Sequence, residues 1–327
     1  MIRVKLIEKA SKTDKDAKPP VIRGNCIFIR DAACTDYDWL AVYDELPKNS
    51  GTITDETEVL QCPREHTILV TVEPPSIKLY PKCYTSQFEY VLTTHSPQEL
   101  PHRNHIYGEG CLDWCAGIQT DEVFAMPDYP KTKDIATVCS TKQQTHTLHK
   151  KRYELTSYLA SRLPELDWYG WGVIPLKNKY EAQAAYRYSI AIENYIAPYH
   201  WTDKISDPIL NLCLTFYAGD PRLEEVLPAE SFIRIPLEDH EKAYHIIRDT
   251  IDNNEYEKRL PAIREARRII VEQNNIFNRI AALIAQAAPA SHTPDKQIKK
   301  IKGRHTLRRN PLNALAELVM HIRHKLR

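Results

Sequence analysis

The chain of 327 residues is poor in glycine and lacks the paired cysteines of zinc or redox motifs. Nine glycines stand against 22 prolines, which favours well-defined turns over flexible linkers. Eight cysteines are scattered without any C-x-x-C pair, and Cys111 and Cys115 have no partner pair at zinc-finger spacing. We therefore expect free thiols in a reducing compartment.

Long apolar runs are missing as well. The first residues, MIRVKLIEKASKTDKDAK, contain no apolar core of a signal peptide. No stretch reaches the roughly 18 consecutive apolar residues of a membrane-spanning helix. The formal net charge is +1, so the chain as a whole is not basic. These absences predict a cytoplasmic protein without a membrane span and without a nucleic-acid partner.

Strands and helices alternate along the sequence. The run 67–72 (TILVTV) is β-branched and uncharged, which is typical of a buried strand, and it stops before two prolines. Residues 149–163 have the apolar spacing of a helix, 188–192 (YSIAI) read as a strand, and 202–212 read as a helix. This order predicts an α/β protein with parallel sheets, and the length predicts two domains.

Polar residues follow the strand 188–192 directly. Glu193 and Asn194 end it, and Thr202-Asp203-Lys204 opens the next helix. In parallel sheets ligands bind beyond the carboxyl ends of the strands, and a helix N-terminus attracts phosphate. Arg152 lies near the start of another helix that follows a strand. Two such cations would suit a diphosphate, although a solvated lysine and a capped strand end are the simpler interpretations of the single residues.

Together these pieces resemble the donor-binding signature of the α-1,3-fucosyltransferases, glycosyltransferase family 10. The matching pieces are Arg187 before YSIAI, then Glu193-Asn194, Thr202-Asp203-Lys204, LTFYAG ending at Gly219, and Ser231-Phe232-Ile233. Upstream, Lys131-x-Lys133 and Arg152 resemble the family too. The resemblance implies the following donor-binding residues: Arg152, Arg187, Glu193, Asn194, His200, Thr202, Asp203, Lys204 and Gly219.

The resemblance also implies a fold and an activity. The fold would be GT-B-like, with two Rossmann-like domains facing a cleft: residues 1–135 for the acceptor and 136–290 for the donor. The activity would be inverting transfer of a sugar, fucose from GDP-fucose, to a hydroxyl of a glycan such as a lipopolysaccharide or surface-glycan precursor. No cofactor or metal would be required.

Two positions depart from the family pattern. His200 stands where the family has tyrosine, and Asp203 stands where it has glutamate. Because these positions lie near sugar and nucleotide in the family, a different nucleotide-linked sugar stays open as the donor. A family member that binds nucleotide or glycan without turnover is the alternative of another class.

Inversion needs one carboxylate to take the proton of the acceptor hydroxyl. Glu73 is the candidate base because it follows the strand 67–72 and precedes the stiffening pair Pro74-Pro75. Glu109, Asp113 and Glu193 are the other carboxylates in question.

Two further groups contain residue types that bind metals. The triplet Asp36-Tyr37-Asp38 could hold a metal in a GT-A enzyme, but it precedes a strand and is better interpreted as a loop. The histidines His95, His102 and His105 are interpreted as surface loop residues in the same way.

The C-terminal segment 291–327 is a basic amphipathic tail in this interpretation. From Lys296 onward it carries ten Lys or Arg and one acid, Glu317. A helical face gathers apolar residues, namely Leu312, Leu315, Leu318 or Val319, Ile322 and Leu326. The pattern predicts peripheral contact with an anionic membrane at its inner face. The alternatives are a helix packed on the protein and a nucleic-acid patch.

Overall fold

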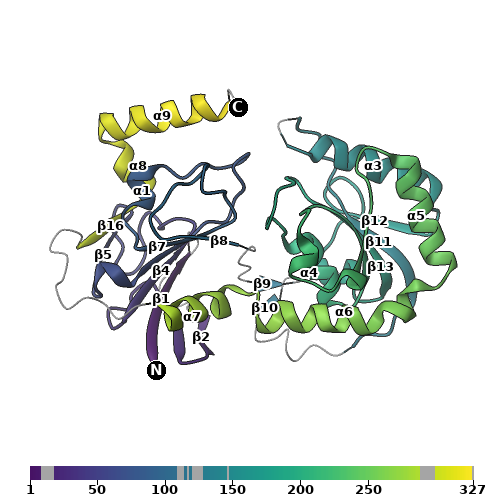
Figure 1. The fold of residues 1–327 in the computed structure, drawn as a ribbon, viewed down its shortest axis with the longest axis horizontal. Coiled ribbons are helices and arrows are strands. Elements are labelled where there is room, and N and C mark those ends of the chain that lie inside the picture. Colours follow the sequence, from purple (N-terminus) through teal and green to yellow (C-terminus); the bar gives the residue numbers. More distant parts are fainter. Residues whose placement is uncertain are drawn as a thin grey trace. The chain divides into compact units, whose positions relative to one another are not determined.

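The computed structural model describes residues 1–8, 18–108, 114–115, 118–119, 128–145, 147–287 and 299–325. The chain forms two compact units (Figure 1). The first comprises Met1–Gly108 and Phe277–Arg327, and the second comprises Glu109–Ile276. This division differs from the predicted boundaries near 135 and 290, because the chain leaves the first unit earlier and returns to it at Phe277.

The first unit is built on a seven-stranded sheet in the order β2-β3-β1-β4-β6-β7-β8. All neighbours pair in parallel except β2 and β3, which are antiparallel. The strands are β1 (Ile2–Glu8), β2 (Lys18–Arg23), β3 (Cys26–Arg30), β4 (Trp39–Tyr43), β6 (Thr67–Val70), β7 (Tyr90–Thr93) and β8 (His105–Tyr107). Short helical turns η2 (Arg64–His66) and α1 (Lys82–Thr85) lie between them.

The central strands of this sheet are buried on both faces. Every residue of β6 is buried, and only Tyr43 of β4 is partly exposed. Such continuous apolar strands are what a covered parallel sheet requires. Lys5 of β1 is the exception: it is fully buried, and its Nζ lies 2.8 Å from Glu58 Oε1 and 2.8 Å from Thr52 Oγ1. The charge is thereby paired and hydrogen-bonded, as burial demands.

The C-terminal segment belongs to the first unit. Strand β16 (Lys300–Lys302) pairs antiparallel with β5 (Thr57–Val59), and Ile301 is fully buried in the core of this unit. Helices α8 (Arg304–Arg308) and α9 (Pro311–Lys325) follow (Figure 1). A C-terminal helix is present as predicted, but the described part of the segment, 299–325, is not a separate tail. It completes a sheet and a core.

The second unit contains a five-stranded, wholly parallel sheet in the order β12-β11-β13-β14-β15. The strands are β11 (Lys133–Val138), β12 (Leu166–Tyr169), β13 (Tyr186–Ile192), β14 (Leu214–Ala218) and β15 (Phe232–Arg234). The helices are α3 (His149–Arg162), α4 (Asp203–Leu210), α5 (His240–Asp252) and α6 (Glu255–Glu272). Short elements complete it: β9 (Trp114–Cys115), β10 (Ile118–Gln119), η3 (Lys179–Ala182), η4 (Leu223–Glu225) and η5 (Ala229–Ser231).

Helices cover both faces of this sheet, and strand alternation decides which side chain meets which helix. Ile190 of β13 packs in one cluster with Leu155 of α3 and Ile247 of α5. The next residue, Ala191, points to the other face and packs with Ile205 of α4, in a cluster that α6 completes. Period-two alternation therefore builds two apolar layers from one strand. The predicted α/β fold class, with two parallel-sheet units and a C-terminal helix, is confirmed.

Two elements of the second half end early. Helix α6 ends at Glu272, and α7 (Ile276–Gln286) begins after a turn. The short helical turn η3 ends at Ala182, and β13 begins at Tyr186. Among the residues that the structure describes, no helix combines the length and hydropathy needed to cross a bilayer.

Candidate functional site

A cavity of about 120 Å³ lies in the second unit where β11 and β13 end. Its wall includes Val138, the last residue of β11, and Ile192, the last residue of β13. Strand β12 pairs on one side of β11 and β13 pairs on the other, so the strand order reverses here. Such a reversal point, at the carboxyl ends of parallel strands, is the usual place for a ligand in this class of fold.

Arg152 of α3 lines this cavity and is 6% exposed. Its Nη1 donates to Asn194 Oδ1, its Nε has no hydrogen-bond partner, and it forms no ion pair with any described carboxylate. The main-chain carbonyl of Asn194, two residues after β13, accepts from the N–H of Leu148, the N-cap of α3, so the end of β13 is tied to the start of α3. A buried guanidinium is costly unless an anion compensates it. The site therefore supplies a charge that an anionic ligand would complete.

Thr202 and Glu193 organise the start of α4. Thr202 is the N-cap, and its Oγ1 accepts from the N–H of Lys204 at 3.3 Å. The fully buried Glu193 accepts from the N–H of Thr202 at 2.9 Å, and its Oε2 lies 3.5 Å from Lys204 Nζ. Glu193 is thus occupied inside the protein. Its role in this geometry is to hold the cap and the lysine in place.

Lys179 of η3 lines the same cavity, although nothing in the sequence pattern pointed to it. Its Nζ contacts Asp203 of α4 and lies 3.4 Å from Asp207 Oδ2. Three cations (Arg152, Lys179 and Lys204) and two carboxylates (Asp203 and Asp207) thus line the cavity together. Lys179 was missed because it lies on a short turn outside the strand and the helix that carried the prediction.

Gly219 follows β14 and is required by close packing. A Cβ at this position would lie 2.1 Å from Tyr217 Oη and 2.7 Å from Glu193 Cγ. Only a glycine lets the chain pass so close to the carboxylate that holds α4. The predicted site residue is therefore a packing requirement in this structure.

His200 and Arg187 differ in where they lie. His200 is buried two residues before the Thr202 cap, with its ring edge-on to Tyr195 at 5.5 Å. Arg187 lies near the amino end of β13, where it pairs with Asp134 at 3.2 Å and Glu257 at 3.7 Å. The structure therefore brings His200 near the α4 N-terminus but leaves Arg187 at the opposite end of the strand from Glu193.

Glu73 lies in the first unit, three residues after β6 ends at Val70. Its side chain is exposed. Its main-chain carbonyl accepts a hydrogen bond of 2.8 Å from His95 Nε2, and His95 is 1% exposed. Burial lowers the pKa of His95, which favours the neutral ring. His95 thereby anchors the backbone at Glu73. The other candidate bases Glu109 and Asp113 lie outside the described residues.

The acidic triplet and the histidines serve structural contacts. Asp36 pairs with Arg3 at 3.3 Å, and Asp38 Oδ2 accepts from the N–H of Arg3, both at the amino end of β4. His102 and His105 each contact a main-chain carbonyl, of Phe88 and His95 respectively. Since His95 is buried, its interpretation as a surface residue was wrong. Among the described residues no group of three or more His, Cys, Asp or Glu side chains could hold a metal.

The structure has detectable likeness to solved glycosyltransferases. It resembles a crystal structure of an α1,3-fucosyltransferase with 15% identity and a TM-score of 0.49, over 90% of this chain and 92% of that one. A GDP-fucose complex of α1,3-fucosyltransferase gives 12% identity and a TM-score of 0.46, over 79% and 81%. Sucrose-phosphate synthase from Thermosynechococcus elongatus gives 10%, a TM-score of 0.41, and coverage of 88% and 99%.

Sequence comparison adds nothing to these likenesses. No family model matches the chain, and a search of curated proteins finds no match. The structural values are too low to carry a conclusion about family or activity.

Proposed function

We propose that the chain is a glycosyltransferase that binds the diphosphate of a nucleotide sugar in the cavity of the second unit. The observation that carries the proposal is Arg152, a buried guanidinium on the cavity wall with a free Nε and no carboxylate partner. The N-terminus of α4 and Lys204 add positive charge beside it. A diphosphate leaving group needs such groups where its negative charge develops.

The donor that fits the sequence signature best is GDP-fucose, and the acceptor is a glycan hydroxyl. Glu73 would remove the acceptor proton as the oxygen attacks the anomeric carbon, with inversion and without a covalent intermediate. The two units would act together as in a GT-B enzyme, and no metal or cofactor is proposed. EDTA should leave the activity intact.

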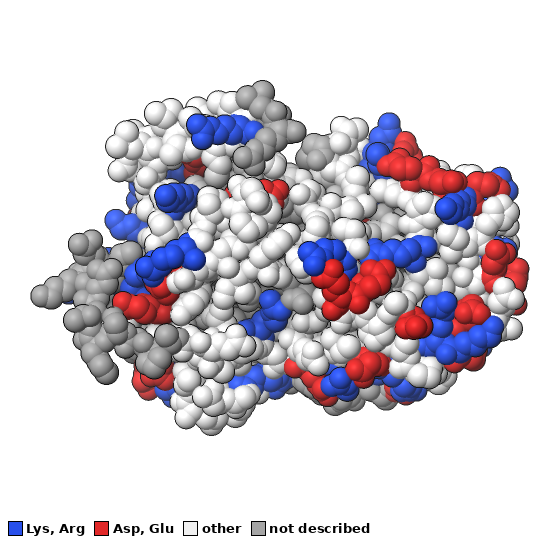
Figure 2. All heavy atoms as spheres, in the orientation of Figure 1, with Lys and Arg blue, Asp and Glu red and all other residues white. Residues whose placement is uncertain are grey.

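Peripheral contact with an anionic membrane is part of the proposal. Helix α9 exposes an apolar stripe: Leu312, Leu315, Leu318, Val319 and Ile322 are 38–75% exposed. The surface over α9 is mostly uncharged in the space-filling view, with basic atoms toward the end of the helix (Figure 2). An apolar stripe beside basic residues suits the interface of an anionic bilayer. A lipid-linked glycan precursor would be reached there.

A panel of nucleotide sugars tests the donor. A ligand that binds only the folded protein raises the free energy of unfolding by about 2.7 kcal/mol at a hundredfold excess over Kd. GDP-fucose should raise the melting temperature of the wild type, and Arg152→Ala should remove most of that rise. Release of GDP that depends on acceptor separates a transferase from a chain that only binds nucleotide. If no GDP-sugar or UDP-sugar shifts the melting temperature, the proposal fails.

A further inference from the structure

A second, larger cavity lies in the first unit, and none of the residues that the proposed reaction uses line it. Its volume is about 350 Å³, and it lies between α9 and the segments 79–85 and 98–101. This volume is within the range of small-molecule sites. Its lining is mainly apolar, as the following residues show: Leu79, Tyr80, Pro81, Leu100, Pro101, Ala316, Val319 and Met320.

The rim of the cavity carries more positive than negative side chains. Lys82 and Arg323 line it, are exposed, and form no ion pair with any carboxylate in the described part of the chain. Glu99 also lines it, and its Oε2 accepts from the N–H and the hydroxyl of Ser96 at 2.9 and 3.0 Å, which fixes the carboxylate without removing its charge. Because two cations stand against one carboxylate, the rim is positive on balance, above apolar walls.

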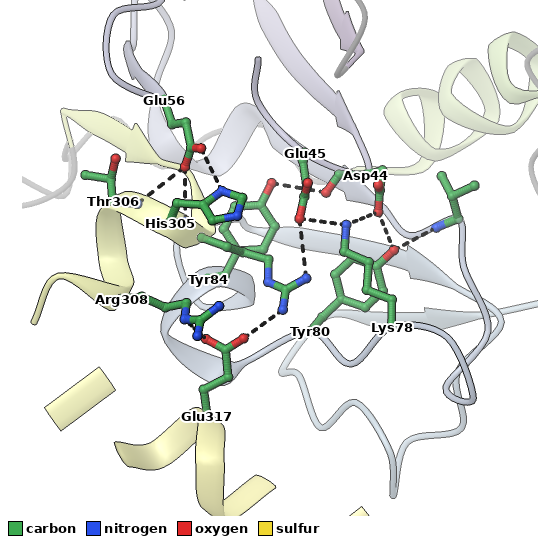
Figure 3. Close-up of polar contacts among 12 residues, drawn as sticks. Asp44, Glu45, Glu56, Lys78, Tyr80, Tyr84, His305, Thr306, Arg308 and Glu317 are labelled. Carbon is green, nitrogen blue, oxygen red and sulfur yellow. Dashed lines mark hydrogen bonds and ion pairs between the residues drawn. The ribbon is translucent and has the colours of Figure 1, made fainter. Parts of the chain in front are cut away.

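The cavity is continuous with the exposed stripe of α9. Val319 lines the cavity and is 38% exposed, and it belongs to the same stripe as Leu315 and Ile322. Polar contacts hold helix α9 at its N-terminal half: Glu317 accepts from Arg304 at 2.8 Å (Figure 3), and Asn313 Nδ2 donates to the main-chain carbonyl of Leu307 at 3.1 Å. An apolar chain that enters along the stripe would fill the space that α9 leaves open.

We infer that this cavity binds the hydrocarbon chain of a phosphate-bearing lipid, with the phosphate held by Lys82 and Arg323. Apolar walls would remove the chain from water, which is the main favourable contribution to binding. The two cations would distinguish a phosphate lipid from a neutral one. Identification of this lipid as the carrier of the glycan acceptor rests on the proposed function. The binding of the lipid does not.

Cys83 provides a reporter inside the cavity. It lines the wall as a free, partly exposed thiol, and burial raises its pKa. Alkylation of the full chain with N-ethylmaleimide at pH above neutrality is followed at Cys83 by peptide mass spectrometry. Dodecyl phosphate, used below its micelle concentration, should slow this alkylation at least tenfold. Inorganic phosphate should not slow it, which separates a lipid from free phosphate.

Variants measured by titration calorimetry with dodecyl phosphate locate the site. Ala316→Trp fills the cavity from an exposed helical position and should abolish binding, and Met320→Trp serves as a second such variant. Arg323→Ala should weaken binding about fivefold, the size of an exposed charge pair. Leu315→Gln lies on the stripe outside the cavity and should leave the affinity for dodecyl phosphate unchanged while it lowers binding to vesicles of phosphatidylglycerol.

Three results would overturn the inference. The first is that inorganic phosphate protects Cys83 as well as dodecyl phosphate does, and the second is that both tryptophan variants bind dodecyl phosphate with wild-type affinity. The third is that protection of Cys83 rises with protein concentration in the absence of lipid, which would indicate that a second copy of the chain occupies the cavity. GDP-dependent stabilisation is measured in the same variants. If GDP does not stabilise the wild-type protein, the proposed function is contradicted. If GDP stabilises Ala316→Trp as it does wild type, the substitution has removed only the lipid site.

Discussion

The carboxyl ends of the two sheets differ in what fills them. In the second unit the chain leaves a cavity beyond β11 and β13, with Arg152 buried on its wall and free to bind an anion. In the first unit the polar residues that follow β4 are already satisfied. Lys78 Nζ lies 2.7 Å from Asp44 Oδ1 and 2.8 Å from Glu45 Oε1, and Tyr80 donates to Asp44 (Figure 3).

The C-terminal segment extends that network in the first unit. Arg304 reaches Glu45 at 3.3 Å and Glu317 of α9 at 2.8 Å, and Arg308 lies 3.5 Å from Glu317. The same kind of sheet thus ends in paired charges in one unit and in an uncompensated cation in the other. Because parallel strands bring polar loops to one end in both units, the unpaired charge distinguishes a ligand site from a structural network.

The largest effect is expected at Glu73, the only proposed catalytic group outside the second unit. Glu73→Gln keeps the size of the side chain but cannot accept a proton. General-base catalysis contributes about 10²–10⁴-fold, so kcat should fall by that factor while the Kd for GDP stays unchanged. Steady-state kinetics and calorimetry check this. Near-normal turnover would reassign the base to Glu109 or Asp113, since Glu193 is fully buried and bonded to Thr202 and Lys204.

Removal of Glu317 should break the network of the first unit. Its side chain is 5% exposed between two arginines. Glu317→Ala takes one of two carboxylates from Arg304, which is 14% exposed and keeps only Glu45, so the expected loss in the free energy of unfolding is about 1.5–3 kcal/mol. Glu265→Ala is the matched control, since its pair with Arg268 is exposed and worth at most about 1 kcal/mol. Urea unfolding compares them, and equal losses would contradict a structural network.

Gly219→Ala should strain the open site of the second unit. The added Cβ would meet Tyr217 Oη and Glu193 Cγ. Overpacking of this kind costs about 1–3 kcal/mol, so the melting temperature should fall by several degrees and GDP should bind more weakly. Tyr217→Phe would not relieve the strain, because the ring Cζ would still lie 2.2 Å from the added Cβ. A wild-type melting temperature and GDP affinity in Gly219→Ala would contradict the packing requirement.

The smallest effect is the pH dependence of His95. Its pKa is lowered in the folded state, so the unfolded chain binds more protons between that lowered value and about 6.5. The stability that the neutral ring provides is therefore present above pH 6.5 and is lost as the pH falls through the folded pKa, by at most about 1.4 kcal/mol per pH unit. His95→Gln should show a flatter dependence than wild type between pH 7.5 and 5.5 in urea unfolding. Parallel curves would contradict this role.

Part of the candidate site could be predicted from the sequence because some of its residues are neighbours in the sequence. Thr202, Asp203 and Lys204 follow a strand and open a helix, and cap chemistry marks them without any knowledge of the fold. Arg187 lies in the same strand, at its amino end. Its position in the sequence does not show which end of the strand is near the cavity. Lys179 could not be predicted, because only its tertiary contacts with Asp203 and Asp207 bring it to the site.

The first unit was harder to predict because its closing contacts are non-local. Strand β16 has three residues, too few for a period-two pattern, and it pairs with β5 about 240 residues earlier in the chain. The amphipathic pattern of 311–327 predicts the helix. It does not predict that Glu317, the one acidic residue of this segment, is buried between Arg304 and Arg308. The apolar pattern predicts a helix, whereas the burial of one of its residues depends on which other segments pack against it.

Calorimetric titration of GDP into wild type, Arg152→Ala and Arg187→Ala tests the central claim most directly. Both arginines belong to the same sequence signature, but only Arg152 lines the cavity. Loss of a hydrogen-bonded charge contact costs about 1.5–3 kcal/mol, so Arg152→Ala should weaken GDP binding by about 10- to 150-fold. Arg187→Ala should bind GDP within about twofold of wild type, as expected for loss of exposed ion pairs. Equal weakening by both substitutions, or wild-type affinity in Arg152→Ala, would contradict a donor site at this end of the sheet.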